Sequence, residues 1–122
     1  RVKFEEKKRY LQAVTALLTG KYGEGVIKLT LKDQYYNMRE MVEPYPEVID
    51  KAFQAMEKAG VTPIVRPIRG GTDGARLSYM GLPCPNLFTG GMNFHGKYEY
   101  CSLNTMQKAM QTILNLIELW GK

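Results

Sequence analysis

The sequence contains few of the residues from which metal and disulfide sites are usually built. Its 122 residues include two cysteines and a single histidine. Two cysteines cannot form the framework of a disulfide-rich secreted domain, and neither Cys84 nor Cys101 belongs to a CxxC pair. We therefore expect two reduced thiols in a cytoplasmic protein. His95, the single histidine, cannot complete a zinc site without ligands from elsewhere.

Long apolar runs and clustered charges are also missing. No stretch approaches the roughly 20 apolar residues that span a bilayer, and the charged N-terminus lacks the apolar core of a signal peptide. The net charge of +5 comes from scattered basic residues, several of which share a predicted helix with Glu5 and Glu6. A solvated helix face explains this pattern better than a nucleic-acid interface. We expect neither membrane nor nucleic acid as a partner.

Three longer helices are predicted from apolar residues at helical spacing. The first covers residues 3–18, with Gly20 as its stop signal. The second begins at Pro46 and closes at Gly60. The third follows Ser102, whose hydroxyl is well suited to cap it.

Strand-like segments alternate with these helices. They cover residues 26–32, 62–68 and 85–91, and a short helix is predicted between the last two. Alternation of this kind predicts an α/β fold in which helices pack over a sheet. The first helix and strand have no partner within their own stretch, so we expect two structural units that divide near residues 33–45.

The first candidate site is a Gly-rich turn, Arg69–Gly74, which follows a predicted strand and opens a short helix. Paired glycines let a ligand approach the backbone closely, and free N–H groups at a helix start attract anions. The GxGxxG and GK[ST] patterns are both absent, which excludes a dinucleotide fingerprint and a P-loop. Taken alone, the turn is better explained as a helix start capped by Thr72 or Asp73.

The second candidate site is the loop that carries His95, within the sequence TGGMNFHGK. Neutral imidazole is a good zinc ligand, and Glu99 or Asp73 could orient its second nitrogen. The alternative is an exposed or hydrogen-bonded loop histidine, which a lone histidine more often is. A third stretch, Tyr35–Arg39, could clamp a carboxylate through its arginine, but aromatic packing of a linker is the plainer interpretation.

Taken together, these motifs resemble a known family. IRGGTDGARLSYMGLPCPNLFTGGMNFHGKYEY, residues 68–100, closely resembles the C-terminal region of the peptidase T family. These are the tripeptide aminopeptidases of the di-zinc aminopeptidase/carboxypeptidase superfamily. The likeness extends back through DQYYNMRE and forward through the last helix, and the order of the motifs is far more specific than any one of them.

The resemblance implies a catalytic α/β domain that binds two zinc ions, into which a smaller α/β lid domain is inserted. Residues 1–33 would be the end of the lid, and residues 34–122 the C-terminal part of the catalytic domain, with residues 33–45 as a hinge. His95 would be a zinc ligand. The residues placed beside the substrate would be Arg69, Gly70, Gly71, Thr72 and Asp73.

The same resemblance implies that much of the active site lies outside these 122 residues. The HxD motif, the glutamate pair with the general base, and the aspartate ligands of the family are not found here. We therefore expect a C-terminal fragment with no catalytic residue of its own and no peptidase activity alone. In the complete enzyme its partners would be a tripeptide, from which the N-terminal residue is released, and the rest of the same polypeptide. The sequence leaves open whether the enzyme forms a homodimer.

Two alternatives remain at this point. One is a different di-zinc enzyme of the same superfamily, such as a dipeptidase, a carboxypeptidase or a deacylase. These share the GGT turn and the late histidine, but not the YYNMRE and IRGGTDGA sequences. The other is a non-catalytic module that binds a peptide or a partner subunit.

Overall fold

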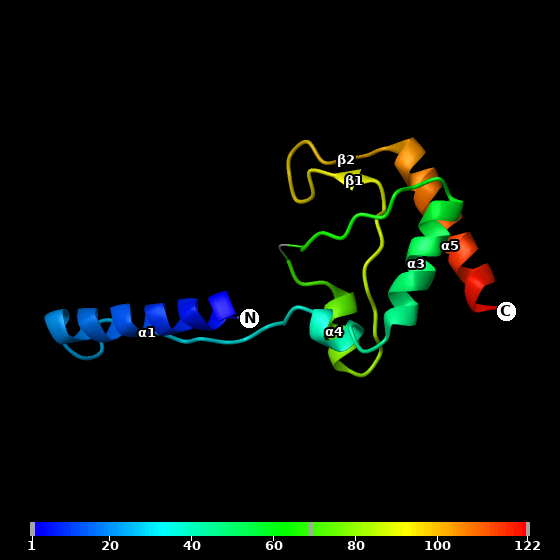
Figure 1. The fold of residues 1–122 in the computed structure, drawn as a ribbon. Helices are drawn as coiled ribbons and strands as arrows, with labels where there is room; N and C mark the ends of the chain where they lie inside the picture. The colour runs from blue at the N-terminus through cyan, green and yellow to red at the C-terminus, as the bar shows by residue number, and fades with distance from the viewer. Residues whose placement is uncertain (1, 69, 122) are drawn as a thin grey trace. The chain divides into compact units, whose positions relative to one another are not determined.

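A computed structural model describes residues 2–68 and 70–121 of the chain. It contains two compact units, Arg1–Asn37 and Met38–Lys122, which are described separately below. The elements are α1 (Val2–Tyr22), α2 (Arg39–Val42), α3 (Pro46–Lys58), α4 (Asp73–Tyr79), β1 (Gly91–Met92), β2 (Tyr100–Cys101) and α5 (Leu103–Trp120) (Figure 1). In the described part of the chain, no helix combines the length and apolar character that a membrane span requires.

The first unit consists of α1 and the coil that follows it. The helix passes through Gly20, the predicted stop, and ends at Tyr22. Gly23 then adopts a positive φ of 95°, and its N–H donates to the carbonyl of Thr19 at 2.8 Å. This is the left-handed helix end that glycine favours. The helix therefore ends at the glycine that can take up this conformation and close the last turn.

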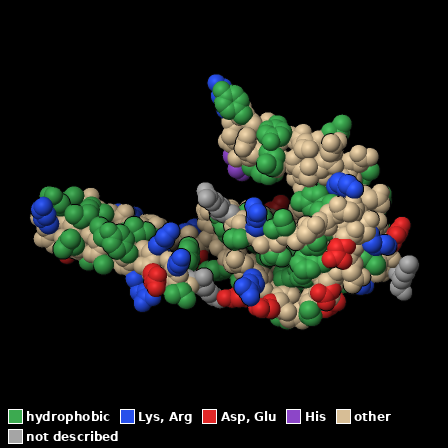
Figure 2. Space-filling view, turned by 45° about the horizontal axis from the view of Figure 1, so that its top comes forward, with side chains coloured by type: hydrophobic (Ala, Val, Ile, Leu, Met, Phe, Trp, Pro, Cys, Tyr) green, Lys and Arg blue, Asp and Glu red, His purple; other side chains and the backbone are tan. Residues whose placement is uncertain are grey.

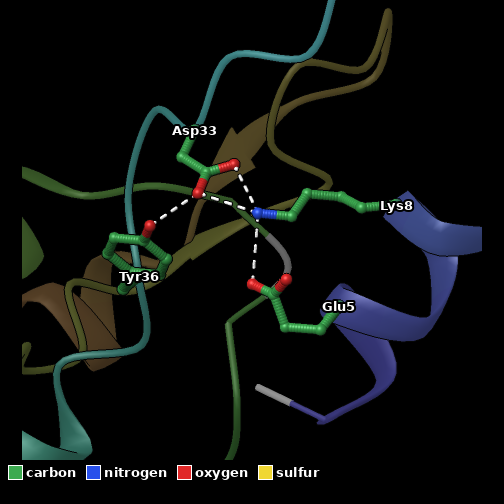
Figure 3. Close-up of polar contacts among 4 residues, drawn as sticks. All are labelled: Glu5, Lys8, Asp33 and Tyr36. Carbon is green, nitrogen blue, oxygen red and sulfur yellow. Dashed lines mark hydrogen bonds and ion pairs between the residues drawn. The ribbon is translucent and has the colours of Figure 1, made fainter. Parts of the chain in front are cut away.

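Coil residues return to the start of α1 through a cluster of polar contacts, which we call the Asp33 cluster: Glu5, Lys8, Asp33 and Tyr36 (Figure 3). Asp33 accepts hydrogen bonds from the Tyr36 hydroxyl at 2.6 Å and from Lys8 Nζ at 3.0 Å. Lys8 also lies 3.1 Å from Glu5. The Tyr36 hydroxyl and Lys8 lower the pKa of Asp33, while Asp33 and Glu5 raise the pKa of Lys8.

The second unit is built on the packing of α3 against α5, which lie side by side in Figure 1. Small residues line the contact. Ala55 of α3 and Thr112 of α5 are both fully buried. Two side chains of α5 also bind carbonyl groups at the end of α3. Lys108 Nζ donates to Ala59 at 2.6 Å, and Asn115 Nδ2 donates to Ala55 at 3.0 Å. Close backbone approach and polar contacts together fix the two helices.

The predicted ends of α3 and α5 are confirmed. Pro46 occupies the first turn of α3. At its other end Gly60 has a φ of 68° and donates to Glu57, while Val61 donates to Met56. This pair of bonds is a Schellman motif. Ser102 caps α5, where its hydroxyl oxygen accepts a hydrogen bond from the N–H of Thr105 at 3.4 Å.

Five of the large apolar residues of α5 lie at the surface. They form a stripe along the helix that is roughly half exposed, although their spacing is typical of a core-facing helix. Figure 2 shows apolar side chains at several places on the face that it draws. The members of the stripe are Met106, Met110, Ile113, Leu114 and Ile117.

The three predicted strands are largely wrong. Residues 26–32 and 62–68 are coil, and of residues 85–91 only Gly91 belongs to a strand. Within residues 2–68 and 70–121, the only sheet is the antiparallel pair β1–β2, in which Gly91 lies opposite Cys101. A strand needs a neighbour for its backbone N–H and C=O groups. The predicted sheet of an α/β fold is thus replaced by a mostly helical arrangement, because these segments have no strand partners here.

The Asp33 cluster predicts a specific pH dependence. Because the pKa of Asp33 is lowered on folding, its contribution to stability is present above about pH 4 and is lost as the pH falls through the lowered pKa. The contribution of Lys8, whose pKa is raised, is present below about pH 10 and is lost above the raised pKa. Replacement of Asp33 by Asn should therefore loosen residues 33–37 at neutral pH, but should change little in acid.

Backbone ¹⁵N relaxation of residues 33–37 measures this effect directly. Glu24→Gln is the matched control, because Glu24 is an exposed carboxylate of the same unit with no hydrogen bond or ion pair to another described residue. Equal relaxation in Asp33→Asn and the unchanged chain at neutral pH would contradict the assignment.

Candidate functional site

The Gly-rich turn begins α4, and Thr72 is its cap. The Thr72 hydroxyl oxygen accepts a hydrogen bond from the N–H of Ala75 at 3.2 Å. It accepts a second one from Asn86 Nδ2 at 3.1 Å. Of the two caps that the sequence allows, Thr72 is confirmed. The bond to Asn86 ties the turn to a segment that is distant in the sequence.

A close backbone contact lies in the first turn of α4. A Cβ on Gly74 would lie 2.5 Å from the carbonyl oxygen of Cys84 and 2.9 Å from Asn86 Oδ1, so this position has no room for a side chain. The Ser78 hydroxyl donates to the carbonyl of Gly74 at 2.7 Å and accepts from the N–H of Cys84 at 2.9 Å. This contact is not among the predictions made from the sequence. The sequence feature that indicates it is a glycine and a serine four residues apart, Gly74 and Ser78, which share one face of the helix.

Other predicted residues of the turn are open to solvent. Gly70, Gly71 and Asp73 are exposed, and neither glycine makes a hydrogen bond to another residue that the structure describes. Their N–H groups can therefore donate to a ligand. Arg69, the remaining predicted substrate contact, lies outside the described residues.

His95 lies in the loop between β1 and β2, which we call the His95 loop, residues 93–99. Asn93 and His95 adopt positive φ angles of 56° and 62°. Gly96 closes the first turn, since its N–H donates to the carbonyl of Asn93 at 2.9 Å. Asn93 Nδ2 then donates to the carbonyl of Tyr98 at 3.3 Å. Backbone and amide contacts thus give this short loop a defined shape.

Glu99 contacts the backbone of His95 and not its ring, which the sequence suggested that Glu99 or Asp73 could orient. Its Oε2 accepts a hydrogen bond from the His95 N–H at 3.0 Å. The imidazole itself is exposed and has no hydrogen bond to another described residue, Asp73 included. Both ring nitrogens therefore remain open to a ligand.

The His95 loop is anchored to α5 at Gly90. This buried glycine has a φ of 97°, and a Cβ on it would lie 2.8 Å from the N atom of Met106. Its carbonyl accepts a hydrogen bond from the N–H of Ser102 at 3.0 Å. The connecting segment, residues 83–91, is thus held at one end by α4 and at the other by α5. Figure 1 shows it running from α4 to the hairpin.

No complete metal site forms within the described residues. Between residues 2 and 121, leaving out residue 69, no three His, Cys, Asp or Glu side chains come close enough to hold a metal ion. His95 has the chemistry and the exposure to supply one ligand, because neutral imidazole is a common zinc ligand. These residues therefore fit a zinc ion only as the source of one ligand.

The third candidate, Tyr35–Arg39, divides between the two units. Tyr36 belongs to the Asp33 cluster of the first unit. In the second unit Arg39 forms an exposed ion pair with Glu43 at 3.4 Å, one helical turn away. Tyr36 also packs edge-on against Phe4, with ring centroids 6.3 Å apart, which agrees with the plainer interpretation of aromatic packing.

Comparison with known proteins identifies the class of this chain. Residues 6–119 match Peptidase family M20/M25/M40, and the chain belongs to this family. It is 60% identical over 120 residues to Peptidase T of Alkaliphilus oremlandii and 58% identical over 122 residues to Peptidase T of Clostridium novyi. These matches cover 98% and 100% of the chain but only 29% and 30% of the two relatives. The resemblance to the peptidase T family is confirmed, and the chain spans less than a third of its relatives' length.

The close contact at Gly74 predicts a strong effect of substitution. In Gly74→Ala the added Cβ must displace the backbone of Cys84, which should lower the stability of the second unit by about 1–3 kcal/mol, as overpacking usually does. The amide of Cys84 should also exchange its hydrogen faster, because its bond to Ser78 is weakened. Gly70→Ala is the control, since a Cβ there meets nothing within 4 Å. Equal urea midpoints for the two variants would contradict the contact.

Proposed function

We propose that this chain forms the C-terminal part of a zinc-dependent tripeptide aminopeptidase, in which His95 binds zinc. The observation that carries the proposal is the 60% identity to a protein named Peptidase T over 98% of the chain. The exposed imidazole in a shaped loop supports it. In the complete enzyme, residues 1–33 would end the lid and residues 34–122 would end the catalytic domain, in the cytoplasm.

His95 would hold one of two zinc ions through a ring nitrogen, while the remaining ligands would come from the part of the enzyme outside these residues. Bound zinc supplies Lewis-acid chemistry and lowers the pKa of a water molecule. The rigid loop would keep the imidazole in place, so that little ordering is needed when zinc binds. Because a general base is also expected elsewhere, we propose that the chain alone has no peptidase activity.

The Gly-rich turn would contact the substrate mainly through its backbone. The exposed N–H groups of Gly70 and Gly71 can donate to a substrate carbonyl or carboxylate. Thr72 already accepts two hydrogen bonds, so it can offer only its hydroxyl proton. Arg69 and Asp73 would lie beside this contact and add one charge of each sign.

A hybrid enzyme tests the proposal. In it, the 120 residues of A. oremlandii Peptidase T that match this chain are replaced by the chain itself. We expect the hybrid to release the N-terminal residue of tripeptides. His95→Ala should reduce activity, and the affinity for one of the two zinc ions, by at least about 100-fold, because removal of even an outer partner of a ligand costs 10- to 100-fold. Lys97→Ala, an exposed change in the same loop, should change neither.

Three results would contradict the proposal. The first is a hybrid that prefers dipeptides or N-acyl amino acids, which would indicate another enzyme of the superfamily. The second is full activity and full zinc content in His95→Ala. The third is tripeptide hydrolysis by the isolated 122-residue chain in the presence of zinc, which would refute its predicted inactivity.

A further inference from the structure

The backbone of His95 adopts a conformation that a non-glycine residue rarely takes without support. Its φ of 62° lies in the left-handed region, as does the φ of Asn93 two residues earlier. Histidine and asparagine enter this region more readily than most residues, but both still need contacts that hold them there. The contacts of the loop therefore decide whether His95 keeps this conformation.

Glu99 provides the contact to His95 itself. Its carboxylate reaches back four residues and accepts the His95 N–H at 3.0 Å. The N–H of Glu99 donates in turn to the carbonyl of Gly96 at 3.1 Å, which places the start of the side chain. Because the backbone conformation of His95 fixes its Cα–Cβ direction, this bond also fixes the direction in which the side chain leaves the loop.

The other loop contacts act on different residues. Gly96 binds the carbonyl of Asn93, and the Asn93 amide binds the carbonyl of Tyr98. These bonds shape the turn without touching His95. Loss of the Glu99 carboxylate should therefore leave the hairpin formed but release the backbone of its histidine.

We propose that Glu99 is a positioning residue for metal binding, whose carboxylate holds the His95 backbone in the left-handed conformation from which the imidazole reaches zinc. The inference rests on the proposed function, because it assumes that His95 is a zinc ligand. It differs from the usual support of a ligating histidine, in which a carboxylate binds the second ring nitrogen. Here the ring stays free and the backbone is held.

Three substitutions of Glu99 distinguish the effect of its side-chain length from the effect of its negative charge. Glu99→Gln keeps the length of the side chain and an acceptor oxygen, Glu99→Asp keeps the charge but is one methylene shorter, and Glu99→Ala loses both. Zinc affinity of the hybrid enzyme, measured by competition with a chelator, should fall about 10- to 100-fold in the Ala and Asp variants. The Gln variant should remain within a few-fold of the unchanged hybrid. Glu24→Ala removes an exposed carboxylate in the other unit and should have no effect.

A second measurement reports the backbone conformation of His95 in the absence of zinc. A residue with positive φ gives a strong Overhauser effect between its own N–H and Hα, because these atoms lie close together. In the full 122-residue chain, His95 should show this effect, keep it in Glu99→Gln, and lose it in Glu99→Ala and Glu99→Asp. Circular dichroism verifies that the helices remain formed in each variant.

The outcomes distinguish this inference from the function on which it rests. If His95→Ala loses zinc while all Glu99 variants keep their affinity and their Overhauser effect, the positioning role is overturned and the function stands. If affinity follows charge, with Glu99→Gln as weak as Glu99→Ala and Glu99→Asp unchanged, the carboxylate acts electrostatically and the positioning role is again overturned. If His95→Ala keeps its zinc, the proposed function fails, and the zinc part of this inference fails with it.

Discussion

The candidate site depends on one connecting segment, residues 83–91, that is fixed at both ends where the backbone leaves no room for a Cβ. At one end Gly74 of α4 lies against the carbonyl of Cys84, and at the other Gly90 lies against the N atom of Met106. Any side chain larger than hydrogen would push these backbones apart. The two glycines thereby hold the Gly-rich turn and the His95 loop on one framework, although about 20 residues separate them in the sequence.

In the same unit α3 packs against α5 through small buried residues, while several large apolar residues of α5 remain at the surface. Ala55 and Thr112 are fully buried in the contact, whereas Ile113 and Ile117 are exposed. Unpaired coil segments such as residues 62–68 show the same imbalance, since their apolar side chains also lie at the surface. The chain spans only 29% of the length of A. oremlandii Peptidase T. Its apolar surfaces accordingly exceed what its own elements can cover.

Sequence analysis succeeded where a structure is determined by neighbouring residues. Gly60, Ser102 and Thr72 act at helix ends as their chemistry predicts, because each cap needs only residues within one turn. It failed for the strand at residues 26–32, since a strand depends on a distant partner that no local pattern reveals. It also did not find that Glu99 would bind backbone instead of imidazole, because that choice depends on the φ angles of the loop. The roles of His95 and of the Gly-rich turn came from family resemblance, and they remain predictions.

The central claim is that an imidazole in this loop binds zinc together with ligands from outside the chain. The most direct measurement is a crystal structure of the hybrid enzyme, with anomalous scattering recorded at the zinc edge. The account predicts a zinc ion about 2.0–2.1 Å from a ring nitrogen of His95, with its other protein ligands outside the 122 residues. Zinc ions coordinated entirely by other residues, with His95 turned away from them, would contradict it.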